Sequence, residues 1–409
     1  MQVMHCQCAG LDVHKKSVAV CALLGEAGPQ PQVFRRSFGT TTGALLELHD
    51  WLRELGVTHV AMEATGAYWK PVWAILEDSF DLTLSNAAHI KQVPGRKTDQ
   101  KDADWIADLL RHGLLRKSLV PPTVQQDLRD LTRHRIQVTG DRSAVSNRIS
   151  KLLEGANVKL GSVASDVMGV SGQRMLDAII GGETDAEKLA ELALGTLRKK
   201  HEALVEALRG RIRPHHRTML RLLMAEWRFL DRLLAETEQA IEEAVRPFME
   251  AVKLLETMPG MKATAAYSLV AELGMNMEVF PDSAHAASWA GICPGNNESA
   301  GKRYSGRTRS GNRWLKRTLC QVAWAASHTG GCYFQAQHRR IAAKRGKKRA
   351  IVALAHSILV TAYTMLKRHC TYQDLGPDYF EKIHAEGLKQ YCIRKLEQLG
   401  HRVVLESVA

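Results

Sequence analysis

Acidic residues are missing from a fifty-residue stretch of this chain. Residues 301–350 contain fourteen lysines and arginines and no aspartate or glutamate, whereas the whole 409-residue chain has a formal net charge of +13. The remainder of the chain is therefore close to neutral, and the excess charge is concentrated in one segment. Because solvated protein surfaces normally intersperse both signs, this segment predicts a polyanionic partner such as nucleic acid.

Paired cysteine motifs, a targeting signal and a membrane-spanning run are also missing. The eight cysteines include one CxC, at Cys6 and Cys8, but no CxxC, which argues against a zinc site and favours reduced thiols in the cytoplasm. The N-terminus has no basic region followed by an apolar core, as a signal peptide would have. The longest apolar run, residues 350–366, is interrupted by polar side chains, so it predicts a buried helix and no membrane partner.

Residues 1–115 alternate between the hydrophobic periods of strands and helices. Three strands are predicted first, followed by helix, strand, helix, strand and an acidic helix, at residues 3–13, 17–24, 32–38, 40–56, 58–65, 66–79, 81–86 and from 98 onward. This order is typical of an α/β, ribonuclease-H-like (RuvC-like) domain. A doubly wound dinucleotide-binding fold is disfavoured, because no GxGxxG turn is present.

Carboxylates occupy unusual positions in this first domain. Asp12 and Glu63 fall within or at the end of predicted strands, where a charge is costly to bury unless a cation compensates it. Asp99 and Asp102 lie three residues apart, which places them on one face of a helix. Taken alone, these two aspartates also fit a helix N-terminus capped by Thr98, where the helix dipole favours acids.

The ordered set of four acids is more specific than any one of them. Two strand carboxylates and two helical ones would supply four oxygen ligands for Mg²⁺, in the manner of a two-metal phosphodiester-cleaving site. The neighbouring Asp104 and Asp108 are predicted to be surface residues.

Helical periodicity dominates residues 116–250. The apolar positions from Leu220 to Phe248 recur at alternating steps of three and four, the pattern of a coiled-coil seam. Two alternatives remain open at this point: a long helix packed within one chain, and self-association of two or more chains.

Residues 251–372 predict a mostly α domain that begins with a helix-hairpin-helix-like element around Pro259 and Gly260 and includes Lys262. A Gly-, Ser-, Asn- and Arg-rich loop follows, and then a basic helix. Residues 373–409 form a C-terminal tail.

Six motifs together resemble one known family. They are GLDVHKK (10–16), EATGAYW (63–69), KTDQKDA (97–103), MPGMKATAA (258–266), WAGICPGNNESAGK (289–302) and TRSGNRWLKR (308–317). In this order they resemble the DEDD transposases of the IS110-type bacterial insertion sequences, whose relatives include Piv-like DNA invertases and bridge-RNA-guided recombinases. The resemblance extends to about residue 370.

The resemblance implies a RuvC-like domain, a helical coiled-coil linker and a transposase domain with a nucleophilic serine. That serine matches Ser299, although Ser305 and Ser310 lie nearby and the family often has Ser-Gly where this chain has Ser299-Ala300. The implied partners are double-stranded DNA, a structured guide RNA and further copies of the chain, as a dimer or tetramer, in the bacterial cytoplasm at the nucleoid. The basic residues predicted to bind nucleic acid are Lys262, Lys302, Arg303, Arg307, Arg309, Arg313, Lys316 and Arg317.

The resulting prediction is a transposase that excises and inserts its own element by Mg²⁺-dependent strand cleavage through a covalent serine–DNA intermediate. Two other hypotheses are compatible with the residues. One is a metal-only RuvC-like nuclease in which Ser299 is structural. The other is a nucleic-acid-binding protein without enzymatic activity, whose acids serve the fold.

Overall fold

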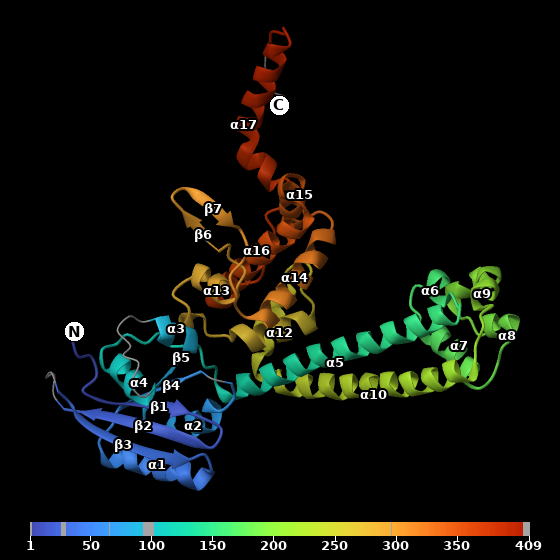
Figure 1. Ribbon diagram of the computed structural model, residues 1–409. Coiled ribbons are helices and arrows are strands. Elements are labelled where there is room, and N and C mark those ends of the chain that lie inside the picture. Colours follow the sequence, from blue (N-terminus) through green and yellow to red (C-terminus); the bar gives the residue numbers. More distant parts are fainter. Residues whose placement is uncertain (1, 26–29, 65, 93–101, 296, 404–409) are drawn as a thin grey trace. The chain divides into compact units, whose positions relative to one another are not determined.

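The computed structural model describes residues 2–25, 30–64, 66–92, 102–295 and 297–403 (Figure 1). The chain divides into two compact units, Met1–Pro121 and Pro122–Ala409.

The first unit is built on a five-stranded mixed sheet in the order β3-β2-β1-β4-β5. Strands β1 and β2 pair antiparallel, as do β2 and β3, whereas β4 runs parallel to both β1 and β5. The strands are β1 (Gln7–Val13), β2 (Ser17–Leu24), β3 (Gln32–Gly39), β4 (His59–Glu63) and β5 (Asp81–Ser85). The helices of this unit are α1 (Thr42–Glu54), α2 (Trp69–Leu76), α3 (Ala87–Gln92) and α4 (Asp102–Arg111).

The predicted order of strands and helices is confirmed, with α3 as one helix that the periodicity did not predict. A mixed five-stranded sheet followed by a mostly helical body is compatible with a ribonuclease-H-like first domain.

The two faces of this sheet are covered by different helices. Alternate residues of β1 point to opposite faces, so Leu11 packs in one hydrophobic cluster with Leu48 of α1 and Leu76 of α2. Cys8 packs in a second cluster with Ile106 and other apolar residues of α4. The strand β1 is thus buried on both faces, which explains its nearly continuous apolar sequence.

The second unit begins with two long antiparallel helices, α5 (Thr123–Gly155) and α10 (Pro214–Ala244), seen side by side in Figure 1. Four short helices and a 3₁₀ turn connect their far ends around one hydrophobic cluster. They are α6 (Leu160–Val163), α7 (Val170–Ile180), α8 (Ala186–Glu191), η1 (Gly195–Lys200) and α9 (His201–Leu208).

The coiled-coil seam of α10 faces α5 of the same chain. Its residues Leu220, Trp227 and Ile241 are buried, and three ion pairs join the two helices at their edges: Arg135–Glu238, Arg142–Asp231 and Arg148–Glu226. Of the two alternatives for this apolar stripe, packing within one chain is therefore confirmed. The seam provides no reason for a second chain, and homo-oligomer formation stays a prediction.

The remaining elements form a helical bundle with one small hairpin. They are η2 (Arg246–Phe248), α11 (Met249–Glu256), α12 (Ala263–Leu273), η3 (Met277–Val279), α13 (Ser283–Trp289), β6 (Asn297–Ser299), β7 (Lys302–Ser305), α14 (Arg313–His328), α15 (Tyr333–Arg345), α16 (Lys347–Arg368) and α17 (Tyr379–Gln398). The predicted helix-hairpin-helix-like element corresponds to α11 and α12. Its Gly260 has φ +80°, and a Cβ there would lie 2.5 Å from the backbone nitrogen of Ala326 in α14.

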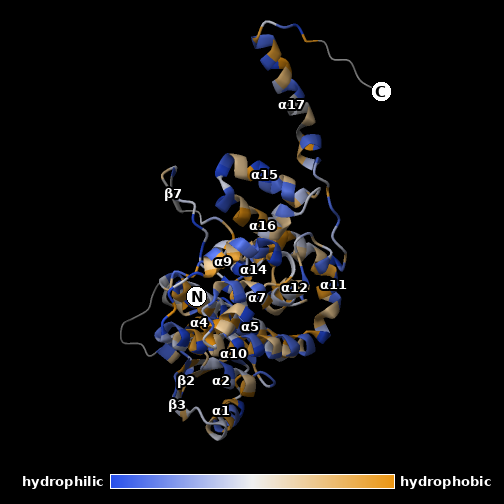
Figure 2. Cartoon of the chain, turned by 90° about the vertical axis from the view of Figure 1, so that its right-hand side faces the viewer, coloured by the Kyte–Doolittle hydropathy of each residue, from blue (hydrophilic) through white to orange (hydrophobic). Residues whose placement is uncertain are grey.

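The helix α16 contains the apolar run of residues 350–366. It is the helix in the described part of the chain that is long and apolar enough to cross a membrane by length and composition, but half of its most apolar window is buried in the protein. Leu354, Ile358 and Leu359 are fully buried, so the predicted buried helix is confirmed. The helix α17 mixes hydrophilic and hydrophobic residues along its length (Figure 2).

Candidate active site

Two of the predicted acids lie side by side at the carboxyl ends of two inner strands of the sheet. The parallel strands β1 and β4 pair from Cys8 and His59 to Leu11 and Met62, so Asp12 and Glu63 follow directly at the carboxyl ends of the two strands. Residues in register on neighbouring strands point to the same face. The two carboxylates are therefore placed side by side on a rigid part of the fold.

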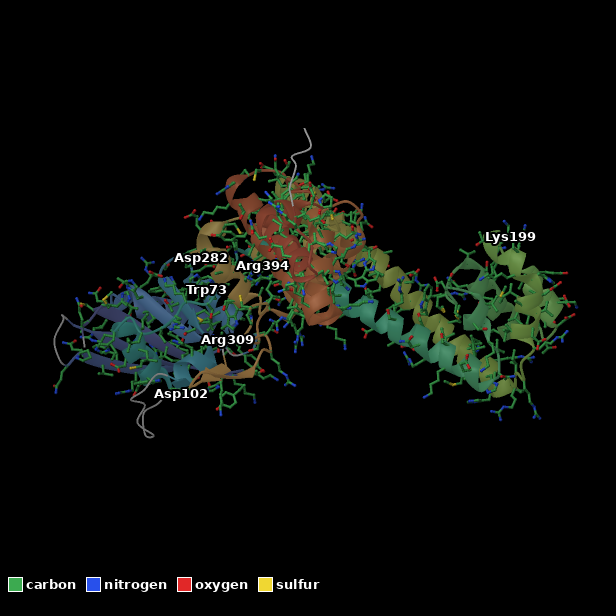
Figure 3. The ribbon with its side chains drawn as sticks, turned by 90° about the horizontal axis from the view of Figure 1, so that it is seen from above. Trp73, Asp102, Lys199, Asp282, Arg309 and Arg394 are labelled. Atoms are coloured by element: carbon green, nitrogen blue, oxygen red, sulfur yellow. The ribbon has the colours of Figure 1, made fainter. Side chains whose placement is uncertain are left out.

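The helix α4 brings a third acid near these strand ends. It crosses β1 so closely that a Cβ on Gly10 would lie 2.3 Å from the backbone nitrogen of Ala107 and 2.4 Å from the carbonyl oxygen of Ala103. Only glycine allows such an approach. Asp102 is the first residue of α4 (Figure 3) and directly precedes Ala103, so the contact at Gly10 sets how near Asp102 comes to the strand.

The electrostatics of Asp12 reflect this crowding. Burial raises the pKa of the Asp12 carboxyl above its usual range, and the carboxylates of Asp102 and Glu63 raise it further. His14 acts in the opposite direction, with its Nε2 atom 3.1 Å from Oδ2 of Asp12. A partly dehydrated carboxylate among other carboxylates is an environment in which a bound cation is strongly favoured.

Asp102 and Glu63 are thus near enough to Asp12 to affect its pKa, while Asp99 lies outside the described residues. Among the residues that are described, no group of three or more His, Cys, Asp or Glu side chains is arranged to hold a metal ion. The raised pKa of Asp12 and the all-oxygen donors fit a divalent cation, but these residues do not complete its coordination.

Asp104 differs from its prediction as a surface residue. Its side chain is only 15% exposed and accepts two hydrogen bonds from Nε of Arg35 in β3, at 3.0 and 3.1 Å. It therefore ties α4 to the edge strand. Asp108 is more exposed, at 43%, and lies 3.3 Å from Nδ1 of His112.

His14 is a site residue that the sequence reasoning did not single out. It lies two positions after Asp12, and extended residues two apart point to the same face. That spacing was a usable signal in the motif GLDVHKK.

The predicted serine loop is in fact a β-hairpin. Ser299, the last residue of β6, pairs with Lys302, the first residue of β7. The two residues between them, Ala300 and Gly301, have φ of +49° and +74°, as in the type I′ turns that suit tight hairpins. The positive φ of Ala300 is unusual, because a Cβ disfavours the left-handed region.

The hairpin is closed at its base by two glycines in backbone contact. A Cβ on Gly311 would lie 2.4 Å from the backbone nitrogen of Gly291. Further along, the amide of Gly295 donates to the carbonyl of Arg307 at 2.8 Å, and Pro294 bridges Thr308. The segment that carries Ser299 is therefore anchored at both ends, although a Gly/Ser/Asn/Arg composition alone predicts a loop.

Replacing Ala300 with glycine is expected to stabilise the hairpin by about 1 kcal/mol, because it removes the left-handed strain of a residue with a Cβ. Hydrogen exchange of the β6 and β7 amides should slow accordingly. The matched control Ala385→Gly, in the exposed helix α17, should instead accelerate local exchange, since glycine weakens a helix. Faster exchange in the hairpin of Ala300→Gly would contradict the assignment of strain.

Comparison with known proteins decides the family. A model of the DEDD transposase of IS110 matches residues 9–158, which include Asp12, Glu63, Asp99 and Asp102. A second model, described as the transposase of the IS116/IS110/IS902 family, matches residues 252–339, which include Ser299. The chain belongs to the IS110-type transposase family.

Two relatives show the same affiliation. An uncharacterized 43.6 kDa protein of insertion element IS110 from Streptomyces coelicolor is 29% identical over 147 residues, which is 35% of this chain and 36% of the relative. An uncharacterized 44.8 kDa protein of insertion element IS116 from Streptomyces clavuligerus is 26% identical over 289 residues, 59% of this chain and 68% of the relative. The family implies dependence on a divalent metal in general.

The basic helix α14 of this transposase is capped at its N-terminus by Asn312. The side chain of Asn312 accepts hydrogen bonds from the amides of Trp314 and Leu315, both at 3.1 Å. Arg313 and Arg317 are exposed in the first turns, where cations oppose the helix dipole. An unfavourable placement of this kind is explained by an anionic partner. Arg309 is also exposed, in the segment between β7 and α14 (Figure 3).

Lys316 has a different environment from its neighbours. Its ammonium group donates to the carbonyl of Gly291 at 3.1 Å and to Oγ1 of Thr308 at 2.5 Å. These contacts join α14 to the base of the hairpin. Lys316 therefore has a role within the fold, and its binding of nucleic acid stays a prediction.

A buried ion-pair network, which the sequence gave no sign of, holds α14 in place. Glu272 of α12 is 2% exposed and accepts two hydrogen bonds from Arg133 of α5, at 2.7 and 2.8 Å. It also lies 3.4 Å from Nε of Arg129 and accepts a hydrogen bond from Nδ2 of Asn312 at 2.5 Å. Three helices of the second unit are thus joined at one carboxylate.

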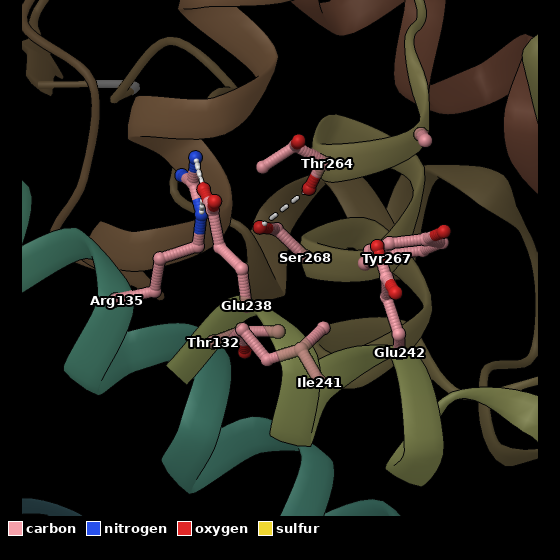
Figure 4. A pocket seen from close by; sticks show the side chains of 9 residues that line it. Thr132, Arg135, Glu238, Ile241, Glu242, Thr264, Tyr267 and Ser268 are labelled. Atoms are coloured by element: carbon pink, nitrogen blue, oxygen red, sulfur yellow. Dashed lines mark hydrogen bonds and ion pairs between the residues drawn. The ribbon is translucent and has the colours of Figure 1, made fainter. Parts of the chain in front are cut away.

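A small pocket of about 160 Å³ lies where α5, α10 and α12 meet (Figure 4). Arg135 donates to Glu238, and the Ser268 hydroxyl donates to the carbonyl of Thr264 at 3.0 Å. Since these polar groups have partners within the protein, the pocket is a packing feature between helices.

Proposed function

We propose that this transposase excises and inserts its own insertion sequence by metal-dependent strand cleavage, with Ser299 as the nucleophile. The observation that carries the proposal is the placement of Asp12 and Glu63 at the carboxyl ends of the paired strands β1 and β4, where burial and the charges of Asp102 and Glu63 raise the pKa of Asp12. Such carboxylates serve phosphodiester chemistry when a cation is bound.

Mg²⁺ is the proposed metal, because the donors are all carboxylate oxygens. Asp12, Glu63, Asp99 and Asp102 are its proposed ligands. When bound, the ion would neutralise charge on the phosphate under attack. The protein side of the site holds the carboxylates in position, through the parallel pairing of β1 with β4 and the close approach of α4 at Gly10.

Ser299 is proposed to form a phosphodiester with the DNA. Its hydroxyl oxygen attacks the phosphorus, its proton passes to solvent, and the bond from phosphorus to one bridging oxygen breaks. The departing oxygen takes up a proton and becomes a free DNA hydroxyl. A hydroxyl of the target strand then attacks the serine ester and releases Ser299. Support for this residue comes from its family motif and from its fixed place at the end of β6.

The proposed partners are element-end and target DNA, a structured guide RNA and further copies of the chain. The fourteen cations and missing acids of residues 301–350 support a nucleic-acid partner. The guide RNA rests on the family resemblance.

A denaturing gel of trapped reactions tests the nucleophile. DNA should be attached covalently to the wild-type protein and to Ser305→Ala, but not to Ser299→Ala, because only Ser299 would form the ester. An adduct that survives in Ser299→Ala would move the nucleophile to another residue. Cleavage of DNA without any adduct in the wild type would favour a metal-only nuclease.

The salt dependence of duplex binding tests the basic helix. Each cation that neutralises a phosphate contributes about 0.9 to the slope of log affinity against log salt, so Arg313→Gln with Arg317→Gln should lower the slope by about 1.8. The single variant Lys316→Gln should change the slope less, since its ammonium group is engaged by Gly291 and Thr308. A slope unchanged by the double substitution would place the DNA-binding surface elsewhere.

A further inference from the structure

A groove lies between the segment that follows β7 and the N-terminal half of α16, all within the second unit. Two adjoining depressions of about 830 and 650 Å³ form it and share Gly306, Arg307 and Arg349. We refer to both together as the hairpin groove. The larger depression falls within the size range of small-ligand sites, about 300–1000 Å³.

The chemistry of the hairpin groove is divided between an apolar floor and a cationic rim. Ile292, Val352 and Ala353 line the larger depression together with Arg307 and Lys348. Among the described residues that line either depression, none is acidic. The rim cations cluster at the start of α16, where the helix N-terminus itself favours anions.

The side-chain amide of Gln337 also lines the hairpin groove, and one of its polar atoms has no hydrogen-bond partner among the described residues. Nε2 of Gln337 donates to the hydroxyl of Ser357 at 2.8 Å, and both side chains line the groove. Oε1 of the same amide is buried and has no hydrogen-bond partner among the described residues. A buried carbonyl oxygen without a donor is destabilising, so a ligand N–H group that donates a hydrogen bond to this oxygen would remove that cost.

These features match one nucleotide of an unpaired strand. An apolar floor accepts the face of a base, an amide reads a base edge, and arginine and lysine bind the phosphates. Tyr304, 68% exposed in the smaller depression, offers a further ring for stacking. A base within a duplex is already stacked and paired and would have to leave the helix to enter.

We propose that the hairpin groove binds an unpaired nucleotide of the DNA strand that Ser299 attacks. The choice of this DNA strand follows from the position of the groove in the protein. The groove residues Gly306 and Arg307 directly follow β7, and β7 is paired with β6, which ends at Ser299. A base held in the groove keeps its own phosphate close to the hairpin. This inference rests on the proposed function for the identity of the strand, but the groove and its ligand chemistry do not depend on cleavage.

Binding of a single-stranded DNA oligonucleotide that contains 2-aminopurine tests the groove, with the same oligonucleotide in a duplex and an RNA of the same sequence as comparisons. Ala353→Phe fills the floor without changing charge, and Ala343→Phe, at an exposed position of α15 outside the groove lining, is the matched control. We expect Ala353→Phe to weaken single-strand binding at least tenfold, with duplex binding changed less than twofold and Ala343→Phe like wild type.

Gln337→Leu provides a second variant that removes the amide and keeps the size of the side chain. It should weaken single-strand binding and reduce differences in affinity between bases. Circular dichroism and thermal melts establish that each variant is folded. Wild-type single-strand affinity in both groove variants would overturn the proposal. So would RNA binding that is tighter than DNA binding and is lost in Ala353→Phe, because the groove would then serve the RNA.

The Ser299→Ala protein separates this inference from the proposed function. It should bind the 2-aminopurine strand as tightly as wild type, since it leaves the groove intact. If wild type forms no DNA adduct but the groove variants still lose binding, the serine mechanism fails and the groove stands. If the adduct forms and the groove variants bind normally, the groove assignment alone fails.

Discussion

Replacing Asp12 with asparagine is expected to slow DNA strand cleavage by at least about a thousandfold. A bound metal supplies several kcal/mol of transition-state stabilisation, and each loss of about 1.4 kcal/mol is a tenfold loss of rate. Burial and the charges of Asp102 and Glu63 all raise the pKa of Asp12. Cleavage of a labelled duplex that contains the element end, at saturating Mg²⁺, measures the effect.

Stability and a neighbouring acid provide the controls for this result. The metal-free Asp12→Asn protein should have a melting temperature no lower than that of the wild type. An uncharged amide removes the repulsion between like charges that contributes to the raised pKa of Asp12. Asp108→Asn, on the exposed side of α4, should cleave at nearly the wild-type rate. Full activity in EDTA, or in Asp12→Asn, would show that these acids do not hold the catalytic metal.

Replacing Glu272 with alanine is expected to lower the free energy of unfolding by about 3–5 kcal/mol, which is the usual cost of removing one partner of a buried ion pair. Arg129 and Arg133 would then be left without their shared carboxylate, and Asn312 without an acceptor for its amide. Burial already lowers the pKa of Arg129, which shows how poorly this site hydrates a cation. Equilibrium unfolding in urea measures the loss.

Glu238→Ala is the matched control for this substitution. Glu238 is paired with Arg135 between α5 and α10, but its side chain is 44% exposed, and exposed pairs contribute about 0–1 kcal/mol. Equal destabilisation by the two substitutions would contradict a special role of the buried network. A folded Glu272→Ala protein should also bind duplex DNA more weakly, because Asn312 both caps α14 and contacts Glu272.

Much of this molecule was determined by patterns that the sequence displays locally. The apolar periods of residues 3–86 predicted the five strands of the first unit and the helices α1 and α2 in their order, because alternation and helical spacing depend on near neighbours in the chain. The family was identified from six short motifs in order, and both family matches agree with it. The charge imbalance of residues 301–350 is likewise a property of composition alone.

Only the tertiary structure shows which helices, strands and side chains contact one another. The seam of α10 was visible in the sequence, but that it packs on α5 of the same chain was not. Asp104 and Lys316 carry charges typical of surface residues, yet each is bound by a group distant in the sequence, Arg35 for Asp104 and Gly291 for Lys316. Their roles depend on how the elements pack.

The serine segment shows the same division most clearly. Its glycines, serines and asparagines predict a loop, because each of these residue types favours turns by itself. The hairpin exists because Gly291 and Gly311 let two backbones touch, and because β6 and β7 then pair across a two-residue turn. Backbone contact between residues twenty apart, like the shared carboxylate of Glu272, depends on three-dimensional closure, and no local pattern of residues encodes it.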